Sequence, residues 1–234
     1  MVAMTSIGRT TVPSESAPPP RRDAADRPVT FLFTDLHSST ALYERMGDVA
    51  AYNIVRRHFM FLGGIVFGHN GMVVKTIGDA VMATFGDPID AVRAALAMQS
   101  RIADFNRAHM GGDADRRLVI RLGVHCGGSV RVELDDRVDY FGSAVNLAAR
   151  LRGQSRGGDI VLSHVVAGYP AVRLLLATLP TRKESLRFKG FYELVRFVRV
   201  SPETGQSTGD SSVLPMPKRP LARPSPAGFA LGGH

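Results

Sequence analysis

The chain has 234 residues, a net charge of +8 and a pI of about 10.2. Its hydrophobic content of 44% and charged content of 21% are ordinary for a globular protein. No apolar run approaches the roughly 18 residues that a membrane-spanning helix needs, and the start lacks the basic-then-apolar pattern of a secretory signal. The single cysteine, Cys126, excludes an internal disulfide, so we expect a cytoplasmic protein.

The basic residues are scattered along the chain and do not alternate with aromatic residues as in RNA-binding motifs. We therefore expect no nucleic-acid partner, whereas a phosphate-rich small substrate would suit the positive charge.

Composition divides the chain into three parts. Residues 1–27 are rich in Pro, Ser and charge, and we predict a disordered leader there. Residues 201–234 have a similar composition, which predicts a disordered basic tail. A single domain over residues 28–200 remains between them.

The elements of this domain can be predicted in chain order. Residues 29–35, "VTFLFTD", form an apolar run of β-forming residues that predicts a buried strand. Two helices should follow, the second over residues 48–68. The other predicted elements are strands over 72–77 and 80–85, a helix over 88–109, a strand over 117–127, a hairpin over 129–142, a helix over 143–153, a strand over 158–163, and one or two strands within 185–200.

This order predicts an α+β fold with a ferredoxin-like βαββαβ core, in which one sheet carries helices on one face.

A carboxylate ends the first strand, and hydroxyl residues begin three positions after it. Asp35 ends the strand, and Ser38, Ser39 and Thr40 are natural N-caps for the next helix. Free N–H groups and the positive end of the helix dipole suit phosphate at such a position.

A second carboxylate lies in the tight turn of "VVKTIGDAVMATF", four residues after a lysine in an apolar run. If the strands are neighbours, Asp79 meets Asp35 at one end of the sheet, where two carboxylates and substrate phosphates would suit Mg²⁺ or Mn²⁺, two ions per site. Each aspartate alone has a structural explanation, as an N-cap or a turn residue. The pair together with Lys75 favours a functional site.

A third group of polar residues lies near the end of the predicted hairpin. Asn146 and Arg150 are four residues apart, so they share one helix face and could bind ribose and phosphate oxygens. A solvated helix face is the alternative explanation for this spacing. Asp139 precedes Asn146 by seven residues.

Three blocks, "FTDLHSST", "VVKTIGDAVMATF" and "DYFGSAVNLAARL", resemble in order and spacing the signature blocks of class III nucleotidyl cyclase catalytic domains. The resemblance covers residues 28–200. It implies that two chains pair head to tail as a homodimer, with two active sites shared between them.

The resemblance also implies roles for single residues. Asp35, Asp79 and the backbone carbonyl of Leu36 would hold the metal ions. Lys75 and Asp139 would read the adenine ring from the other chain.

Asn146 and Arg150 would stabilise the transition state, and Lys189, in "FKG", would reach the terminal phosphates. The implied reaction converts ATP to 3′,5′-cyclic AMP and pyrophosphate. A guanylate cyclase and a catalytically silent nucleotide-binding or dimerisation module are the alternatives.

The sequence departs from the family pattern at three places. Ala80 replaces the usual glycine after Asp79, which matters if that position needs a positive φ. The hairpin turn at Asp135 and Asp136 is short, which could reduce the element that clasps the partner. Counting back from Asn146 makes Asp139 the base reader, as we expect, whereas a two-residue deletion would make it a bystander.

Overall fold

The structure is a computed structural model that describes residues 28–111, 117–134 and 137–202. The predicted leader, all but two residues of the predicted tail, and the Asp135–Asp136 turn lie outside the described residues. None of the helices in the described ranges combines the length and the apolar composition that a membrane span requires.

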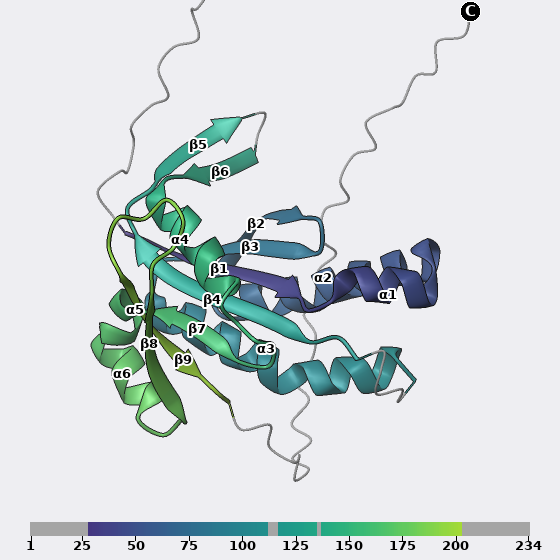
Figure 1. Cartoon of the computed structure of the whole chain (residues 1–234). Helices are drawn as coiled ribbons and strands as arrows, with labels where there is room; N and C mark the ends of the chain where they lie inside the picture. Colours follow the sequence, from purple (N-terminus) through teal and green to yellow (C-terminus); the bar gives the residue numbers. More distant parts are fainter. Residues whose placement is uncertain (1–27, 112–116, 135–136, 203–234) are drawn as a thin grey trace, which may run out of the picture. The chain divides into compact units, whose positions relative to one another are not determined.

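A seven-stranded mixed sheet forms the centre of the fold, in the order β2-β3-β1-β4-β7-β9-β8 (Figure 1). Its neighbours pair antiparallel except β4 and β7, which run parallel. The strands are β1 (Val29–Leu36), β2 (Gly71–Ile77), β3 (Ala80–Phe85), β4 (Ile120–Gly127), β7 (Ile160–Ser163), β8 (Thr181–Leu186) and β9 (Val195–Val200). The α+β class and the mixed sheet are confirmed.

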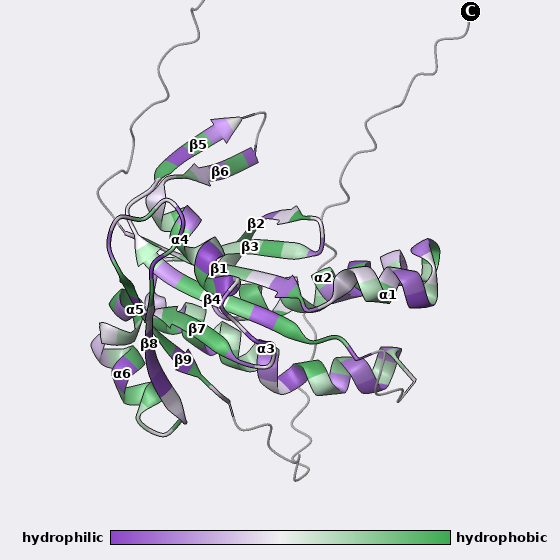
Figure 2. Cartoon of the chain, viewed as in Figure 1, coloured by the Kyte–Doolittle hydropathy of each residue, from purple (hydrophilic) through white to green (hydrophobic). Residues whose placement is uncertain are grey.

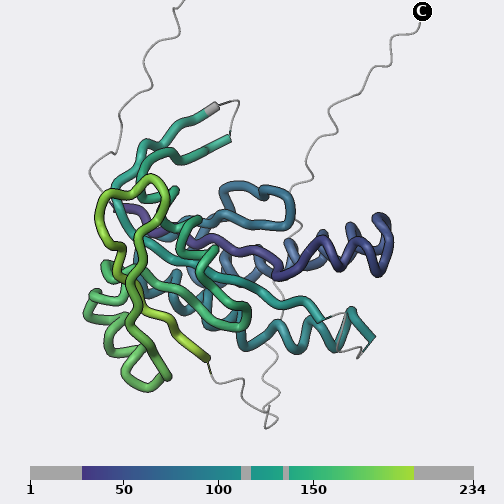
Figure 3. Tube along the Cα trace, viewed as in Figure 1, coloured from purple at the N-terminus to yellow at the C-terminus, as the bar shows by residue number. Residues whose placement is uncertain are grey.

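A separate two-stranded hairpin, β5 (Val130–Leu134) with β6 (Arg137–Phe141), projects from this sheet (Figure 3). The helices are α1 (Ser39–Met46), α2 (Asp48–Gly68), α3 (Pro88–His109), α4 (Ser143–Arg152), α5 (His164–Gly168) and α6 (Pro170–Leu176).

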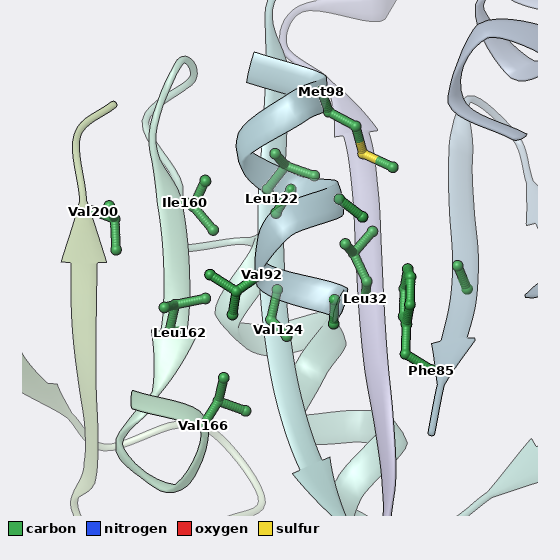
Figure 4. Packing of buried hydrophobic residues seen from close by; sticks show 14 of the residues in the cluster. Leu32, Phe85, Val92, Met98, Leu122, Val124, Ile160, Leu162, Val166 and Val200 are labelled. Atoms are coloured by element: carbon green, nitrogen blue, oxygen red, sulfur yellow. The ribbon is translucent and has the colours of Figure 1, made fainter. Parts of the chain in front are cut away.

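Helices α2 and α3 cover one face of the sheet and bury the largest apolar cluster. Leu32 of β1 and Leu122 of β4 pack against Val92 and Met98 of α3 (Figure 4). Helix α3 begins where predicted, because Asp87 caps the amide of Ile89.

The expectation of helices on one face needs a correction, since α4 packs on the opposite face. There Phe31 and Phe33 of β1 lie with Ala144 and Ala148 of α4 in a second cluster. Successive side chains of a strand point to opposite faces, and both sets in β1 are apolar. Such a strand is buried on both faces, so both need a cover.

Helix α4 lies unusually close to β4, and a glycine makes this approach possible. A Cβ atom at Gly123 would lie 2.1 Å from the backbone nitrogen of Arg152 and 2.7 Å from the carbonyl oxygen of Ala148. Only a residue without a side chain fits there, and this contact fixes the position of the C-terminal half of α4.

The least predictable elements lie in the C-terminal third. The short helices α5 and α6 were not predicted, and β8 begins at Thr181, before the predicted range of 185–200. Figure 2 shows β8 as mostly hydrophilic, in contrast to β3. An exposed edge strand lacks the apolar alternation that marks a half-buried one.

We predict that Gly123→Ala lowers the free energy of unfolding by about 1–3 kcal/mol, because the added methyl must displace the α4 backbone. Urea unfolding measures the change. Gly128→Ala is the matched control, since a Cβ at Gly128 meets nothing within 4 Å and should leave stability nearly unchanged. Equal stability of the two variants would contradict the close approach of α4.

Candidate active site

The two aspartates singled out in the sequence converge at one end of the sheet. Strand β1 pairs antiparallel with β3, so Thr34 lies opposite Val81, and the turn that carries Asp79 comes beside Asp35. Gly78 makes this turn with a φ of 62°. The two carboxyl groups are close enough to share a hydrogen bond when one is protonated.

Two arginines contact the Asp35 carboxylate from the face that α4 covers. Arg121 lies directly opposite Asp35 on β4 and donates a hydrogen bond to Oδ2. Arg152, at the end of α4, places Nη1 2.9 Å from the same oxygen. A buried carboxylate thus has two guanidinium partners and one carboxylate neighbour.

The balance of these charges sets the protonation of Asp35. Burial raises the pKa of its carboxyl, the Arg152 guanidinium opposes that rise, and the Asp79 carboxylate raises the pKa further. The net result is a pKa above the ordinary value. Oδ2 of Asp79 is itself buried and has no hydrogen-bond partner among the described residues.

The hydroxyl residues after Asp35 are arranged differently from the expected caps. Ser38 occupies the N-cap position of α1 in a left-handed conformation, with a φ of 58°, and its side chain does not cap the helix. Ser38 and Ser39 line a cavity of about 270 Å³ together with Leu36, whereas Thr40 is not among its lining residues. A non-glycine residue at positive φ is a strained feature that occurs often at functional sites.

Lys75 and Asp139 form an ion pair. Nζ of Lys75 donates a hydrogen bond of 2.6 Å to Oδ2 of Asp139, across from β2 to β6. Burial alone would raise the pKa of Asp139, but the hydrogen bonds from Lys75 and from the Tyr140 amide bring it below the usual value.

Asn146, Arg150 and Lys189 lie together around a pocket of about 600 Å³ between α4 and the chain after β8. Arg152 and the exposed Tyr192 line the same pocket. Figure 3 shows the segment between β8 and β9 passing beside α4. Neither the two aspartates nor the Lys75–Asp139 pair line this pocket.

The Gly-Asp-Ala departure carries no backbone cost. Among the described residues, positive φ at non-glycine positions occurs at Ser38 and Asn70 and not at Ala80, which begins the buried strand β3. Gly78 supplies the conformational freedom that the turn requires.

Sequence reasoning missed three polar residues of this region. Arg121 could have been found from the β1–β4 register, because it lies directly opposite Asp35. Arg152 depends on the placement of α4 and leaves no sequence signal. His58 lies on an apolar face of α2, and nothing in the sequence distinguishes it from an ordinary helix residue.

His58 is fully buried, and both of its ring nitrogens lack hydrogen-bond partners among the described residues. Its ring lies near the aromatic rings of Phe61 and Phe105. Burial lowers the pKa of His58 to about 4, and the Asp79 charge only partly opposes this.

Comparison with known proteins identifies the family. Residues 23–182 match the sequence model of the adenylate and guanylate cyclase catalytic domain. The chain therefore belongs to this family, and the resemblance to class III cyclases is confirmed.

Proteins named as adenylate cyclases and proteins named as guanylate cyclases are both similar to the chain. Adenylate cyclase 1 of Rhizobium meliloti (strain 1021) is 28% identical over 202 residues, which cover 80% of this chain and 30% of that protein. The receptor-type guanylate cyclase gcy-6 of Caenorhabditis elegans is 30% identical over 146 residues, or 58% of this chain and 13% of that protein. The chain thus spans less than a third of the length of each of these relatives.

Solved structures agree with the sequence relatives. The adenylyl cyclase CyaB from P. aeruginosa superposes with a TM-score of 0.65 at 26% identity, over 74% of this chain and 93% of that one.

We predict that His58→Phe weakens the pH dependence of the free energy of unfolding below pH 6.5. With a folded pKa of about 4 against an ordinary value of 6.5, the unfolded chain binds a proton that the folded chain excludes. The contribution of His58 is therefore intact above pH 6.5 and is lost as the pH falls toward 4.

Urea unfolding at pH 7.5 and pH 4.5 measures this loss, which should shrink by about 2 kcal/mol in His58→Phe. Some slope should remain, because His125 is also buried with a pKa of about 4. His164→Gln, at an exposed histidine, is the control and should keep the wild-type slope. An unaltered slope in His58→Phe would contradict a neutral buried ring.

Proposed function

We propose that the chain converts ATP to 3′,5′-cyclic AMP and pyrophosphate at a site shared by two copies of the chain. The observation that carries this proposal is the convergence of the Asp35 and Asp79 carboxylates at the end of β1. A family member that retains this pair has the oxygen ligands that the chemistry of a triphosphate needs.

The residues present suit divalent cations. Asp35 and Asp79 offer hard carboxylate oxygens, and Oδ2 of Asp79 is buried without a partner among the described residues. No group of three or more His, Cys, Asp or Glu side chains converges in the described ranges, so the Leu36 carbonyl, phosphates and water would supply the other ligands. When bound, two Mg²⁺ or Mn²⁺ ions would acidify the ribose 3′-hydroxyl and neutralise the triphosphate charge.

The Lys75–Asp139 pair supports adenine as the base. The Watson–Crick edge of adenine presents one acceptor, N1, and one donor, the N6 amino group. The Lys75 ammonium donates and the Asp139 carboxylate accepts, which is the complementary set. Guanine presents two donors and one acceptor on that edge, for which a second acceptor would serve better than a lysine.

The pocket beside α4 supplies groups for the phosphates and the ribose. Arg150 would meet the charge that develops on the α-phosphate as the 3′-oxygen attacks and pyrophosphate leaves. Asn146 would orient the ribose, and Lys189 would bind the terminal phosphates. Ser38 and Ser39 would add donors near the first aspartate. Positioning and charge neutralisation are the main requirements of such a reaction.

A second copy would complete the site. Asn146 and Arg150 are exposed on α4, and neither aspartate lines their pocket. Apolar side chains of β2 and of the projecting hairpin are also exposed, among them Ile77 at 54% and Phe141 at 50%. A head-to-tail partner would cover these side chains and bring its aspartates to this pocket.

The basic test is incubation of the purified chain with ATP or GTP and with Mn²⁺ or Mg²⁺, followed by chromatographic identification of the product. We expect 3′,5′-cyclic AMP, and none from Asp79→Ala. Asp104→Ala, at an exposed aspartate of α3, should retain full activity. Cyclic GMP as the main product would favour the guanylate alternative, and nucleotide binding without product would favour the silent module.

We predict that two inactive variants restore activity when mixed. Asp79→Ala and Arg150→Ala should each lower kcat by at least about a hundredfold, because each removes a group of both equivalent sites. A mixed dimer contains one site with no altered residue, so activity should return to as much as a quarter of the wild-type value in an equimolar mixture. Absence of recovery, with mixed dimers verified by mass spectrometry, would contradict the shared site.

We predict that the double variant Lys75→Glu/Asp139→Cys reverses the choice of base. The ratio of kcat/KM for ATP to that for GTP should fall by about a hundredfold, since the adenine-complementary pair is replaced. Steady-state kinetics with both nucleotides measures this ratio. An unchanged ratio would show that other residues read the base.

A further inference from the structure

Arg152 lies between Asp35 and the pocket beside α4 of its own chain, which the proposed dimer assigns to two different shared sites. Its Nη1 lies 2.9 Å from Oδ2 of Asp35, and the same residue lines the pocket that contains Asn146, Arg150 and Lys189. Its side chain is 27% exposed, so the guanidinium is accessible from the pocket.

The two arginines on Asp35 differ in how they are held. Arg121 is fixed by the strand register, which sets it directly opposite Asp35 on β4. Arg152 is the last residue of α4, next to Gly153, and its backbone is held by the close contact with Gly123. The Nε atoms of both arginines are buried and have no hydrogen-bond partner among the described residues, so the difference between the two lies in their places in the fold: Arg121 is inside a strand and Arg152 is at the end of a helix.

The position of the Arg152 guanidinium conflicts with a divalent cation on Asp35. The guanidinium contacts Oδ2 of the carboxylate that would hold the cation, and a guanidinium next to a doubly charged ion is strongly repelled in a partly buried site. A polyphosphate that arrives with the cations changes this balance, because its oxygens accept the bidentate hydrogen bonds that a guanidinium makes well.

We propose that Arg152 couples cation binding to nucleotide binding: it occupies Asp35 in the free protein, opposes a cation that arrives alone, and moves to the polyphosphate when the two arrive together. This inference rests on the proposed function, in which Asp35 and Asp79 hold the cations. In this scheme Arg152 exchanges its contact with Asp35 for a contact with the polyphosphate, and the coupling is a free energy shared by the two ligands.

The test measures Mn²⁺ binding directly, by the electron paramagnetic resonance signal of the free ion. It is made on the full chain, without nucleotide and with 3′-deoxy-ATP, which lacks the attacking hydroxyl and cannot be cyclised. Without nucleotide, Arg152→Gln should bind Mn²⁺ about tenfold more tightly than the wild type. With 3′-deoxy-ATP, Arg152→Gln and the wild type should bind Mn²⁺ equally tightly. The factor by which the nucleotide tightens Mn²⁺ binding should therefore be about tenfold smaller in the variant than in the wild type.

Two control variants test whether the positive charge at position 152 is what changes the Mn²⁺ affinity. Arg152→Lys keeps the positive charge and should behave as the wild type without nucleotide. Arg93→Gln removes an exposed arginine of α3, paired with Asp90, and should change neither affinity. Circular dichroism checks that each variant is folded.

The outcomes separate this inference from the function on which it rests. If Asp79→Asn abolishes Mn²⁺ binding while Arg152→Gln leaves it unchanged or weaker, the coupling role of Arg152 is wrong and the cation site stands. If Arg152→Gln is unfolded, tight Mn²⁺ binding by Arg152→Lys without nucleotide would overturn the inference. If Asp79→Asn binds Mn²⁺ as the wild type does, the proposed cation site itself is wrong.

Discussion

The burial of the Asp35 carboxylate is the constraint on which the candidate site depends. A buried carboxylate is unfavourable without compensating charge. Two parts of the fold provide it: the β1–β4 register sets Arg121 opposite, and the last residue of α4 brings Arg152. The β2–β3 turn adds a second negative charge, Asp79, which opposes this compensation. Such a concentration of charge weakens a purely structural explanation, since ion pairs inside proteins contribute little net stability.

The geometry of the candidate site depends on helices covering both faces of the sheet. Alternation along β1 directs Asp35 to the same face as Phe31 and Phe33, and α4 covers that face. Gly123 lets α4 approach closely enough for its C-terminal end to reach the carboxylate, while its exposed side presents Asn146 to the pocket. One helix thus connects the packing of the core with two groups of functional residues.

Sequence reasoning recovers the features that local signals specify. The convergence of Asp35 and Asp79 follows from a short strand, a tight turn and adjacent pairing, and α3 is delimited by the Asp87 cap. Features that depend on packing are not recoverable in this way. The contact of Arg152 with Asp35 requires knowing which face α4 covers. The apolar residues on both sides of β1 indicate that both faces are covered, but they do not indicate which helix covers the second face, and the one-faced arrangement was wrong.

In the proposed dimer, one chain holds only part of each catalytic site. The most direct measurement is the initial rate of cyclic AMP formation from ATP with Mn²⁺, over a wide range of protein concentration. If two chains share each site, the rate rises with the square of the protein concentration at low concentration and becomes linear once dimers predominate. A rate that stays proportional to protein concentration under conditions in which light scattering or sedimentation shows only monomers would contradict it.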